Sequence, residues 1–196
     1  MAPTTLVYLH GFNSAPQSTK AQVLKQLLEA RGMGARFACP KLPHLPDDAI
    51  AAIEAECGRH PDGVTLVGSS LGGFYATHLA EKHGCRAVLL NPAVLPQVDL
   101  EQYLGLQRNL YTGEEYDLTP AHLAQWRALA TQTVHPERYL LIVETGDEVL
   151  DYRQAVAKYA GAEQVVITGG DHMLRSFPQH LDRILAFAGL AAPSTI

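Results

Sequence analysis

The sequence predicts one α/β domain, in which a sheet of about six parallel strands carries helices on both faces. Short apolar, β-rich runs alternate along the chain with stretches of helical periodicity. Consecutive positions in these runs are apolar, which is typical of strands buried on both faces. The length of 196 residues, with 47% apolar and 18% charged residues, suits a single globular domain with a full core.

The expected elements follow one another in a β-α-β-α rhythm, which implies parallel strands and crossover helices. Asp47 is expected to cap the second helix. In order, the sequence predicts a strand at 4–10, a helix at 17–31, a strand at 34–39, a helix at 47–57, a strand at 64–67, a helix at 74–83 and a strand at 86–90. The rhythm resumes with a strand at 139–144, a helix at 152–159, a strand at 164–168 and a helix at 177–190.

Between these two series, residues 94–136 break the rhythm and are too many for a simple loop. We interpret them as a mostly helical, cap-like insertion within the single domain 1–196, with a helix from about Pro120 to Leu129. It follows a strand's carboxyl end, where open α/β sheets bind ligands. It therefore covers the site or forms an extra packing layer. Its aromatic residues are Tyr103, Tyr111, Tyr116 and Trp126.

The central motif is Gly68-Ser69-Ser70-Leu71-Gly72-Gly73, between the strand at 64–67 and the helix at 74–83. Strand, Gly-x-Ser-x-Gly and helix together indicate a nucleophile elbow that presents Ser70. A glycine-rich turn of this kind can also be a plain tight connection or an anion-binding nest. No lysine follows as in a P-loop, and no G-x-G-x-x-G occurs, so the sequence favours the elbow over phosphate binding.

A serine nucleophile needs a base, and the order Ser, acid, His is expected on this type of sheet. His172 follows the last strand in a Gly-Gly turn, although a loop histidine can also be only a solvated surface residue. A near-neutral imidazole can take the Ser70 proton and later return it to the leaving group. The order and position predict His172 as the catalytic base.

Asp147 is the predicted acid, because it follows the preceding strand on the turn Thr145-Gly146-Asp147. Adjacent side chains rarely point at each other's rings, which disfavours Asp171. Glu144 lies inside the strand and could be a buried, paired acid. The competing carboxylates are Glu144, Glu148, Asp151 and Asp171.

An oxyanion hole needs two backbone N–H groups near the nucleophile. Leu71 supplies one at the start of the helix, and the loop after the first strand supplies the other. Phe12 is the first candidate there and Asn13 the second, with Gly11 allowing close approach. We expect His10 to hold nearby loops by hydrogen bonds rather than to react.

Composition excludes several other classes of function. A net charge of −5 without a block of Lys and Arg argues against nucleic acid as a partner. No histidine pair has metal-ligand spacing, so no metal or other cofactor is expected. Three scattered cysteines, Cys39, Cys57 and Cys85, and an N-terminus without a signal-peptide pattern predict a cytoplasmic protein with reduced thiols. No apolar run is long enough to insert stably into a membrane, and the oligomeric state stays open.

Longer strings of the chain resemble the YqiA-like family of small bacterial esterases, within the α/β-hydrolase superfamily. The resemblance spans almost the whole chain and is weakest across 98–136. The strings are Tyr8-Leu9-His10-Gly11-Phe12-Asn13-Ser14 with Lys20-Ala21, Gly68-Ser69-Ser70-Leu71-Gly72-Gly73-Phe74-Tyr75-Ala76, Asn91-Pro92-Ala93 and Thr145-Gly146-Asp147-Glu148-Val149-Leu150-Asp151-Tyr152. The resemblance implies a compact α/β-hydrolase fold and a cytosolic serine esterase with Ser70, Asp147 and His172 as its triad.

The sequence therefore predicts a hydrolase that cleaves carboxylic acyl esters through an acyl-enzyme on Ser70. An acyl-CoA thioesterase with the same triad is the alternative, because both reactions pass through the same tetrahedral intermediate. A non-catalytic binding module on a hydrolase scaffold is the third possibility, since a fold does not fix a function. The expected partner is a small-molecule acyl ester or thioester substrate.

Overall fold

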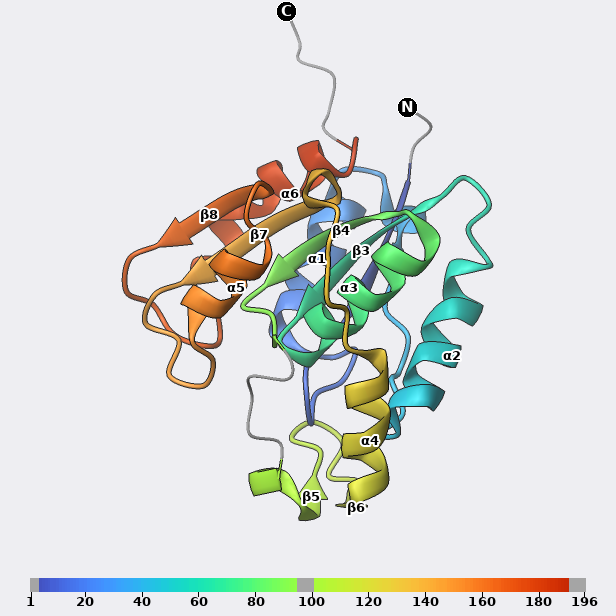
Figure 1. The fold of residues 1–196 in the computed structure, drawn as a ribbon. Coiled ribbons are helices and arrows are strands. Elements are labelled where there is room, and N and C mark those ends of the chain that lie inside the picture. The colour runs from blue at the N-terminus through green and yellow to red at the C-terminus, as the bar shows by residue number, and fades with distance from the viewer. Residues whose placement is uncertain (1–3, 95–100, 191–196) are drawn as a thin grey trace, which may run out of the picture.

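The computed structural model describes residues 4–94 and 101–190, and residues 1–3, 95–100 and 191–196 lie outside this description. Six parallel strands form one sheet in the order β2-β1-β3-β4-β7-β8 (Figure 1). The predicted fold class is confirmed. The strands are β1 (Thr5–Leu9), β2 (Phe37–Ala38), β3 (Val64–Ser69), β4 (Arg86–Leu90), β7 (Tyr139–Glu144) and β8 (Glu163–Ile167).

Helices cover both faces of this sheet, as Figure 1 shows. Side chains of α2, α3, α4 and α5 join one apolar cluster, and those of α1 and α6 join the cluster on the opposite face. The four inner strands are buried almost throughout, which explains their continuous apolar runs. The helices are α1 (Thr19–Ala30), α2 (Pro46–Cys57), α3 (Leu71–His83), α4 (Pro120–Leu129), α5 (Tyr152–Lys158) and α6 (Leu181–Phe187), with short 3₁₀ turns η1 (Gly34–Arg36), η2 (Glu101–Tyr103), η3 (Pro136–Arg138) and η4 (Phe177–His180).

Local expectations differ from the structure at several places. The closing helix predicted at 177–190 is the turn η4 followed by α6, which ends at Phe187. The stretch predicted as a strand at 34–39 begins with the turn η1, and only Phe37 and Ala38 pair with β1. Asp47 does not cap α2, because the helix already begins at Pro46 with Leu45 at its N-cap. Proline suits the first helical position, where its missing N–H is no loss. The Asp47 amide instead donates to the side chain of Gln125 in α4.

The insertion contains a β-hairpin as well as the expected helix. Strands β5 (Gly105–Arg108) and β6 (Glu115–Leu118) pair antiparallel, and α4 follows at Pro120. Figure 1 shows the hairpin and α4 together at one end of the molecule. Sequence periodicity did not reveal the hairpin, because its strands have only four residues each and carry mixed polar side chains. The first residues of the expected insertion, 95–100, lie outside the described residues.

Candidate active site

Ser70 lies at the sharp connection between β3 and α3. Its backbone has φ 54° and ψ −120°, a left-handed conformation that a non-glycine residue adopts only when its surroundings enforce it. The Ser70 amide donates to the Leu90 carbonyl at 3.1 Å, and its carbonyl accepts from the Ala93 amide at 3.0 Å. The end of β4 therefore holds the elbow in this conformation.

Small residues around Ser70 are a steric requirement of the elbow. A Cβ at Gly68 would lie 2.3 Å from the Gly72 carbonyl oxygen, and one at Gly72 would lie 2.0 Å from the Leu9 carbonyl oxygen. A Cβ at Gly11 would lie 3.1 Å from the Ser70 Cβ. The start of α3 therefore packs directly on the end of β1, which brings the loop after β1 next to Ser70.

The three residues predicted as a triad lie in one hydrogen-bonded line. His172 Nε2 is 3.2 Å from Ser70 Oγ, and its Nδ1 is 2.8 and 3.0 Å from the two carboxylate oxygens of Asp147. An ionised carboxylate can only accept, so in the neutral imidazole the proton lies on Nδ1 and Nε2 is left to accept from the serine hydroxyl. This is the tautomer that a base for Ser70 requires.

The surroundings of Asp147 fix its carboxylate toward His172. Asp147 Oδ1 accepts from the amides of Val149 and Leu150 at 2.9 and 2.8 Å. Its side chain is 2% exposed, whereas that of His172 is 19% exposed. The His172 amide donates to the Glu148 carboxylate, which anchors the loop from the other side. The carboxylate is thus buried and oriented, while the imidazole stays open to a ligand.

The other acids considered for this position have different partners. Asp171 pairs with Arg175, and Asp151 pairs with Arg153. Glu144 is 1% exposed and accepts from the Asp171 amide and from the Ser176 amide and hydroxyl. Burial opposes the ionisation of Glu144, but these hydrogen bonds outweigh it and hold its pKa below the usual value. Glu144 shapes the loop that carries His172.

Asn91 is a site residue for which the sequence predicted no role, although it belongs to the string Asn91-Pro92-Ala93 that contributes to the family resemblance. It is buried at the end of β4 with φ 41°, and its Nδ2 donates to the carbonyl oxygens of Asp171 and His172 at 3.1 and 3.3 Å. Its Oδ1 accepts from the Glu144 amide at 3.0 Å. Asn91 thereby ties β4 to β7 and to the His172 loop. The available signal was an asparagine directly after a buried strand, at the edge that carries Ser70.

The two predicted oxyanion donors flank Ser70. Leu71 is the first residue of α3, where backbone N–H groups lack intrahelical partners. Phe12 lies in the loop after β1, and within the described residues no hydrogen bond uses the amide of Leu71 or Phe12. His10 is buried, with Nδ1 near the Gly11 carbonyl and Nε2 accepting from the Leu42 amide, both at 3.2 Å. His10 thus joins two loops, the arrangement expected from the sequence.

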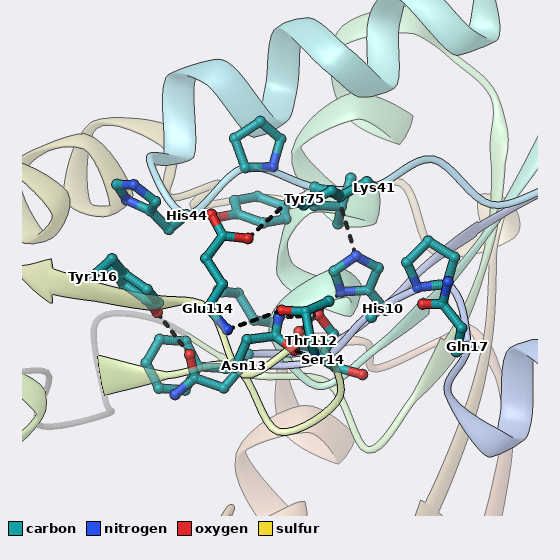
Figure 2. A pocket seen from close by; sticks show the side chains of 18 residues that line it. His10, Asn13, Ser14, Gln17, Lys41, His44, Tyr75, Thr112, Glu114 and Tyr116 are labelled. Atoms are coloured by element: carbon teal, nitrogen blue, oxygen red, sulfur yellow. Dashed lines mark hydrogen bonds and ion pairs between the residues drawn. The ribbon is translucent and has the colours of Figure 1, made fainter. Parts of the chain in front are cut away.

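A pocket of about 440 Å³, shown in Figure 2, has Phe12 and Leu71 among its lining residues. It lies between the loop after β1, the loop before α2 and the β5–β6 hairpin, so the insertion forms one wall. Ser70 and His172 are not among the lining residues, but the lining includes Gly11, where a Cβ would lie 3.1 Å from the Ser70 Cβ, and Leu71, the residue after Ser70. The lining residues are His10, Gly11, Phe12, Asn13, Ser14, Ala15, Pro16, Gln17, Lys41, Leu42, Pro43, His44, Leu71, Tyr75, Asn109, Thr112, Glu114 and Tyr116.

Metal centres and membrane spans are two other kinds of site to consider in the described part of the chain. No group of three or more His, Cys, Asp and Glu side chains there is arranged to hold a metal ion. No helix in the described ranges has both the length and the apolar character to cross a bilayer. The cysteines Cys39, Cys57 and Cys85 are all free thiols.

Comparison with solved structures shows the fold. Alpha/beta hydrolase domain-containing protein 10 from mouse superposes with a TM-score of 0.70 at 15% identity, over 93% of this chain and 88% of that one. A monoacylglycerol lipase from Paleococcus ferrophilus gives a TM-score of 0.66 at 16% identity, over 96% of each chain. The chain therefore has the α/β-hydrolase fold.

Comparison of sequences shows the family. A UPF0227 protein from Serratia proteamaculans (strain 568) is 28% identical, over 94% of this chain and 99% of the relative. The YcfP protein of the same family from Salmonella paratyphi B is 27% identical, with the same coverage. The profile of UPF0227, described as an uncharacterised protein family, matches residues 5–189. The resemblance to YqiA-like proteins is thereby confirmed, and the chain belongs to the UPF0227 family.

Proposed function

We propose that this protein is a serine hydrolase that cleaves carboxylic esters through an acyl-enzyme on Ser70. The supporting observation is the continuous hydrogen-bonded line from Ser70 Oγ through the imidazole of His172 to the carboxylate of Asp147. These side chains come from the loops after β3, β7 and β8. A binding module would have no use for a buried acid that orients a base toward a strained serine.

The acylation step follows from this geometry. Ser70 Oγ attacks the ester carbonyl carbon while His172 Nε2 takes the hydroxyl proton, and the carbonyl electrons move onto its oxygen. Asp147 accepts from His172 Nδ1 and stabilises the imidazolium. When the tetrahedral intermediate collapses, the bond to the alcohol oxygen breaks and His172 protonates the departing alcohol. A water molecule then attacks acyl-Ser70 by the same steps, which releases the acid.

The Leu71 and Phe12 amides would bind the oxyanion that forms in each step. Loss of one such donor in comparable sites costs about 3–4 kcal/mol of transition-state stabilisation. Leu71 also lies at the N-terminus of the 13-residue helix α3, whose dipole favours negative charge there. Phe12 and Leu71 both line the 440 Å³ pocket, so a substrate group bound there would lie next to the two residues that carry the donors.

Three basic side chains around the site already have protein partners, which favours an oxygen ester over an acyl-CoA thioester. CoA phosphates would need available cations near the site. Lys41 at the pocket is paired with Glu114 at 2.9 Å, and Arg153 with Asp151. Lys20 donates to the Met173 carbonyl at 2.8 Å. The monoacylglycerol lipase that shares the fold is named for an oxygen ester, which is consistent with this preference.

A fluorophosphonate probe followed by peptide mapping tests the nucleophile. Wild-type protein should become labelled on Ser70 and should hydrolyse a short-chain nitrophenyl ester. Ser70→Ala should lose both properties, while Ser69→Ala, which changes the neighbouring serine, should keep the labelling. Normal folding without ester turnover in the wild type would instead favour a binding module.

Matched oxygen and sulfur esters test the substrate class. We compare kcat/KM for a nitrophenyl ester and for an acyl-CoA with the same acyl chain. The proposal expects the oxygen ester to be preferred. If the CoA thioester is clearly preferred and Ser70 is still labelled, Ser70 is the nucleophile but the substrate class is a thioester.

A further inference from the structure

The loop that carries Phe12 is bound to the insertion by three hydrogen bonds of one residue, Asn13. Its Nδ2 donates to Gln107 Oε1 at 3.0 Å, its Oδ1 accepts from the Tyr116 hydroxyl at 2.9 Å, and its carbonyl accepts from the Leu110 amide at 2.9 Å. Gln107 is in β5 and Tyr116 is in β6, where they pair in register. The hairpin therefore contacts Asn13 from both strands and from its turn.

The backbone of Asn13 has an uncommon conformation at the point where these bonds hold the loop. Its φ is 51°, in the left-handed region where asparagine is enriched among non-glycine residues. The next residue is also held, because Asn109 Nδ2 donates to the Ser14 carbonyl at 2.7 Å. Residues 13 and 14 are thus fixed directly after the Phe12 peptide, whose amide must point at the oxyanion.

Phe12 is held by the insertion through its ring as well. Its ring meets Tyr103 edge-on at 5.7 Å between centroids and Trp126 of α4 at 6.3 Å. Gln107 connects these contacts, because its Nε2 donates to the Tyr103 carbonyl at 2.7 Å while its Oε1 binds Asn13. The insertion therefore determines both the side-chain position and the following backbone of Phe12.

We propose that the β5–β6 hairpin is a fixed support for the oxyanion loop, with Gln107 and Tyr116 as positioning residues that act on the Phe12 amide through Asn13. The inference rests on the proposed function, because it assigns the hairpin a part in that reaction. It also gives the insertion a definite role: the hairpin remains bound to the loop during turnover, because its release would misplace the donor.

Gln107→Ala is the decisive variant, because Gln107 does not line the pocket and its loss removes no contact with a substrate there. Tyr116→Phe deletes one hydroxyl and keeps the ring, which stacks on His44 at 4.5 Å. The matched control is Tyr111→Phe, which deletes a hydroxyl that has no hydrogen-bond partner within the described residues, on the same hairpin.

An oxyanion donor acts mainly in the transition state, so its misplacement lowers kcat more than it raises KM. We expect Gln107→Ala to lower kcat for a nitrophenyl ester by about tenfold with KM within about twofold, since small displacements of catalytic groups have effects of this size. Tyr116→Phe should lower kcat in the same direction, and Tyr111→Phe should match the wild type. Emission from Trp126, the single tryptophan, verifies that the insertion is folded in each variant.

Hydrogen exchange gives a second measurement that does not depend on activity. A peptide covering residues 10–15 should exchange faster in Gln107→Ala and Tyr116→Phe than in the wild type and Tyr111→Phe. Unchanged kcat and unchanged exchange in both variants would overturn the support role while leaving the ester hydrolase intact. Absence of Ser70 labelling in the wild type would overturn the proposed function itself, so the two failures are distinguishable.

Discussion

At the residue scale, Asn91 has more contacts with the site than its position in the sequence suggests. Its side chain donates to the carbonyl oxygens of Asp171 and His172 and accepts from the amide of Glu144. Asn91→Gly keeps the φ of 41° accessible and removes only the side chain. We expect the free energy of unfolding to fall by about 1–3 kcal/mol, because the Glu144 amide is left buried without a partner. Chemical denaturation measures this loss.

Asn91→Gly should also lower kcat, since the His172 loop loses two of its anchors. Ala at the same position would add backbone strain to these losses, so the two variants separate the side chain from the conformation. Full activity and full stability of Asn91→Gly would show that the loop holds its shape without Asn91.

Gly11 tests how closely the oxyanion loop approaches the nucleophile. Gly11→Ala would place a Cβ 3.1 Å from the Ser70 Cβ and 3.3 Å from the Ser69 carbonyl oxygen. The loop and Ser70 must then separate by a few tenths of an ångström, and we expect kcat for a nitrophenyl ester to fall by about tenfold. Gly58→Ala is the matched control and should have wild-type kcat, because Gly58 is the C-cap of α2 with helical φ and ψ and a Cβ there would meet no atom closer than 3.5 Å.

Glu144 links stability to pH through its lowered pKa. Burial opposes its charge, but the hydrogen bonds from Ser176 and the Asp171 amide favour the carboxylate, so its pKa lies below the ordinary 4.5. The unfolded chain then binds the proton more readily, so the stabilisation is complete above about pH 4.5 and is lost as pH falls through the lowered pKa. Unfolding of wild type and Glu144→Gln at pH 5.5 and pH 3.5 should show a smaller pH dependence in the variant.

An exposed acid provides the comparison for this measurement. Glu29→Gln changes a half-exposed carboxylate of α1 that forms only a surface pair with Lys25. It should retain the wild-type pH dependence. If the free energy of unfolding changes equally with pH in Glu144→Gln and in the wild type, Glu144 does not contribute to the loss of stability in acid.

At the element scale, the start of α4 depends on a buried histidine. The Thr119 amide donates to His122 Nδ1 at 3.1 Å, so that nitrogen accepts and Nε2–H donates to His44 Nδ1 at 3.0 Å. His122 is 2% exposed, and burial together with nearby His44 lowers its pKa below the usual 6.5. Protonation would place a second donor against the Thr119 amide and remove this part of the cap.

Folding stability should therefore decrease as pH falls below 6.5, because the unfolded chain binds this proton more readily than the folded one. His122→Gln keeps a capping box of the Thr-x-x-Gln type but does not titrate. We expect wild type to lose about 1 kcal/mol more than His122→Gln between pH 7.5 and pH 5.5. Denaturation followed by Trp126 emission measures this loss. Identical pH dependence in both proteins would assign the effect to other groups.

Predictability from sequence also differs between elements. The strands at 86–90 and 139–144 have the predicted limits, because continuous apolar runs mark burial on both faces. The β5–β6 hairpin could not be predicted in this way. Its stability comes from contacts with distant residues, such as the bond from Asn13 to Gln107 and the ion pair of Lys41 with Glu114. The hydrophobic periodicity of the hairpin's own sequence does not indicate such distant partners.

At the scale of the whole molecule, the parallel sheet explains why candidates far apart in the chain could be named together. The carboxyl ends of β3, β7 and β8 lie at one edge, so Ser70, Asp147 and His172 were expected to be neighbours. The contributions of Asn91 and Glu144 needed the coordinates, because each acts through backbone groups of other loops. Sequence patterns identify candidate catalytic side chains. They reveal less about side chains that hold a loop in position.

The position of β4 between β3 and β7 has a consequence for how the active site forms during folding. The Leu90 and Ala93 main chains bind the elbow, and Asn91 binds the loop of the base. The elbow and the His172 loop both need β4 in place, paired with β3 on one side and with β7 on the other. The β4–β7 pairing joins segments that the whole insertion separates in the sequence. Contacts between such distant segments form slowly. A refolding chain should therefore regain helix and sheet before its serine can react.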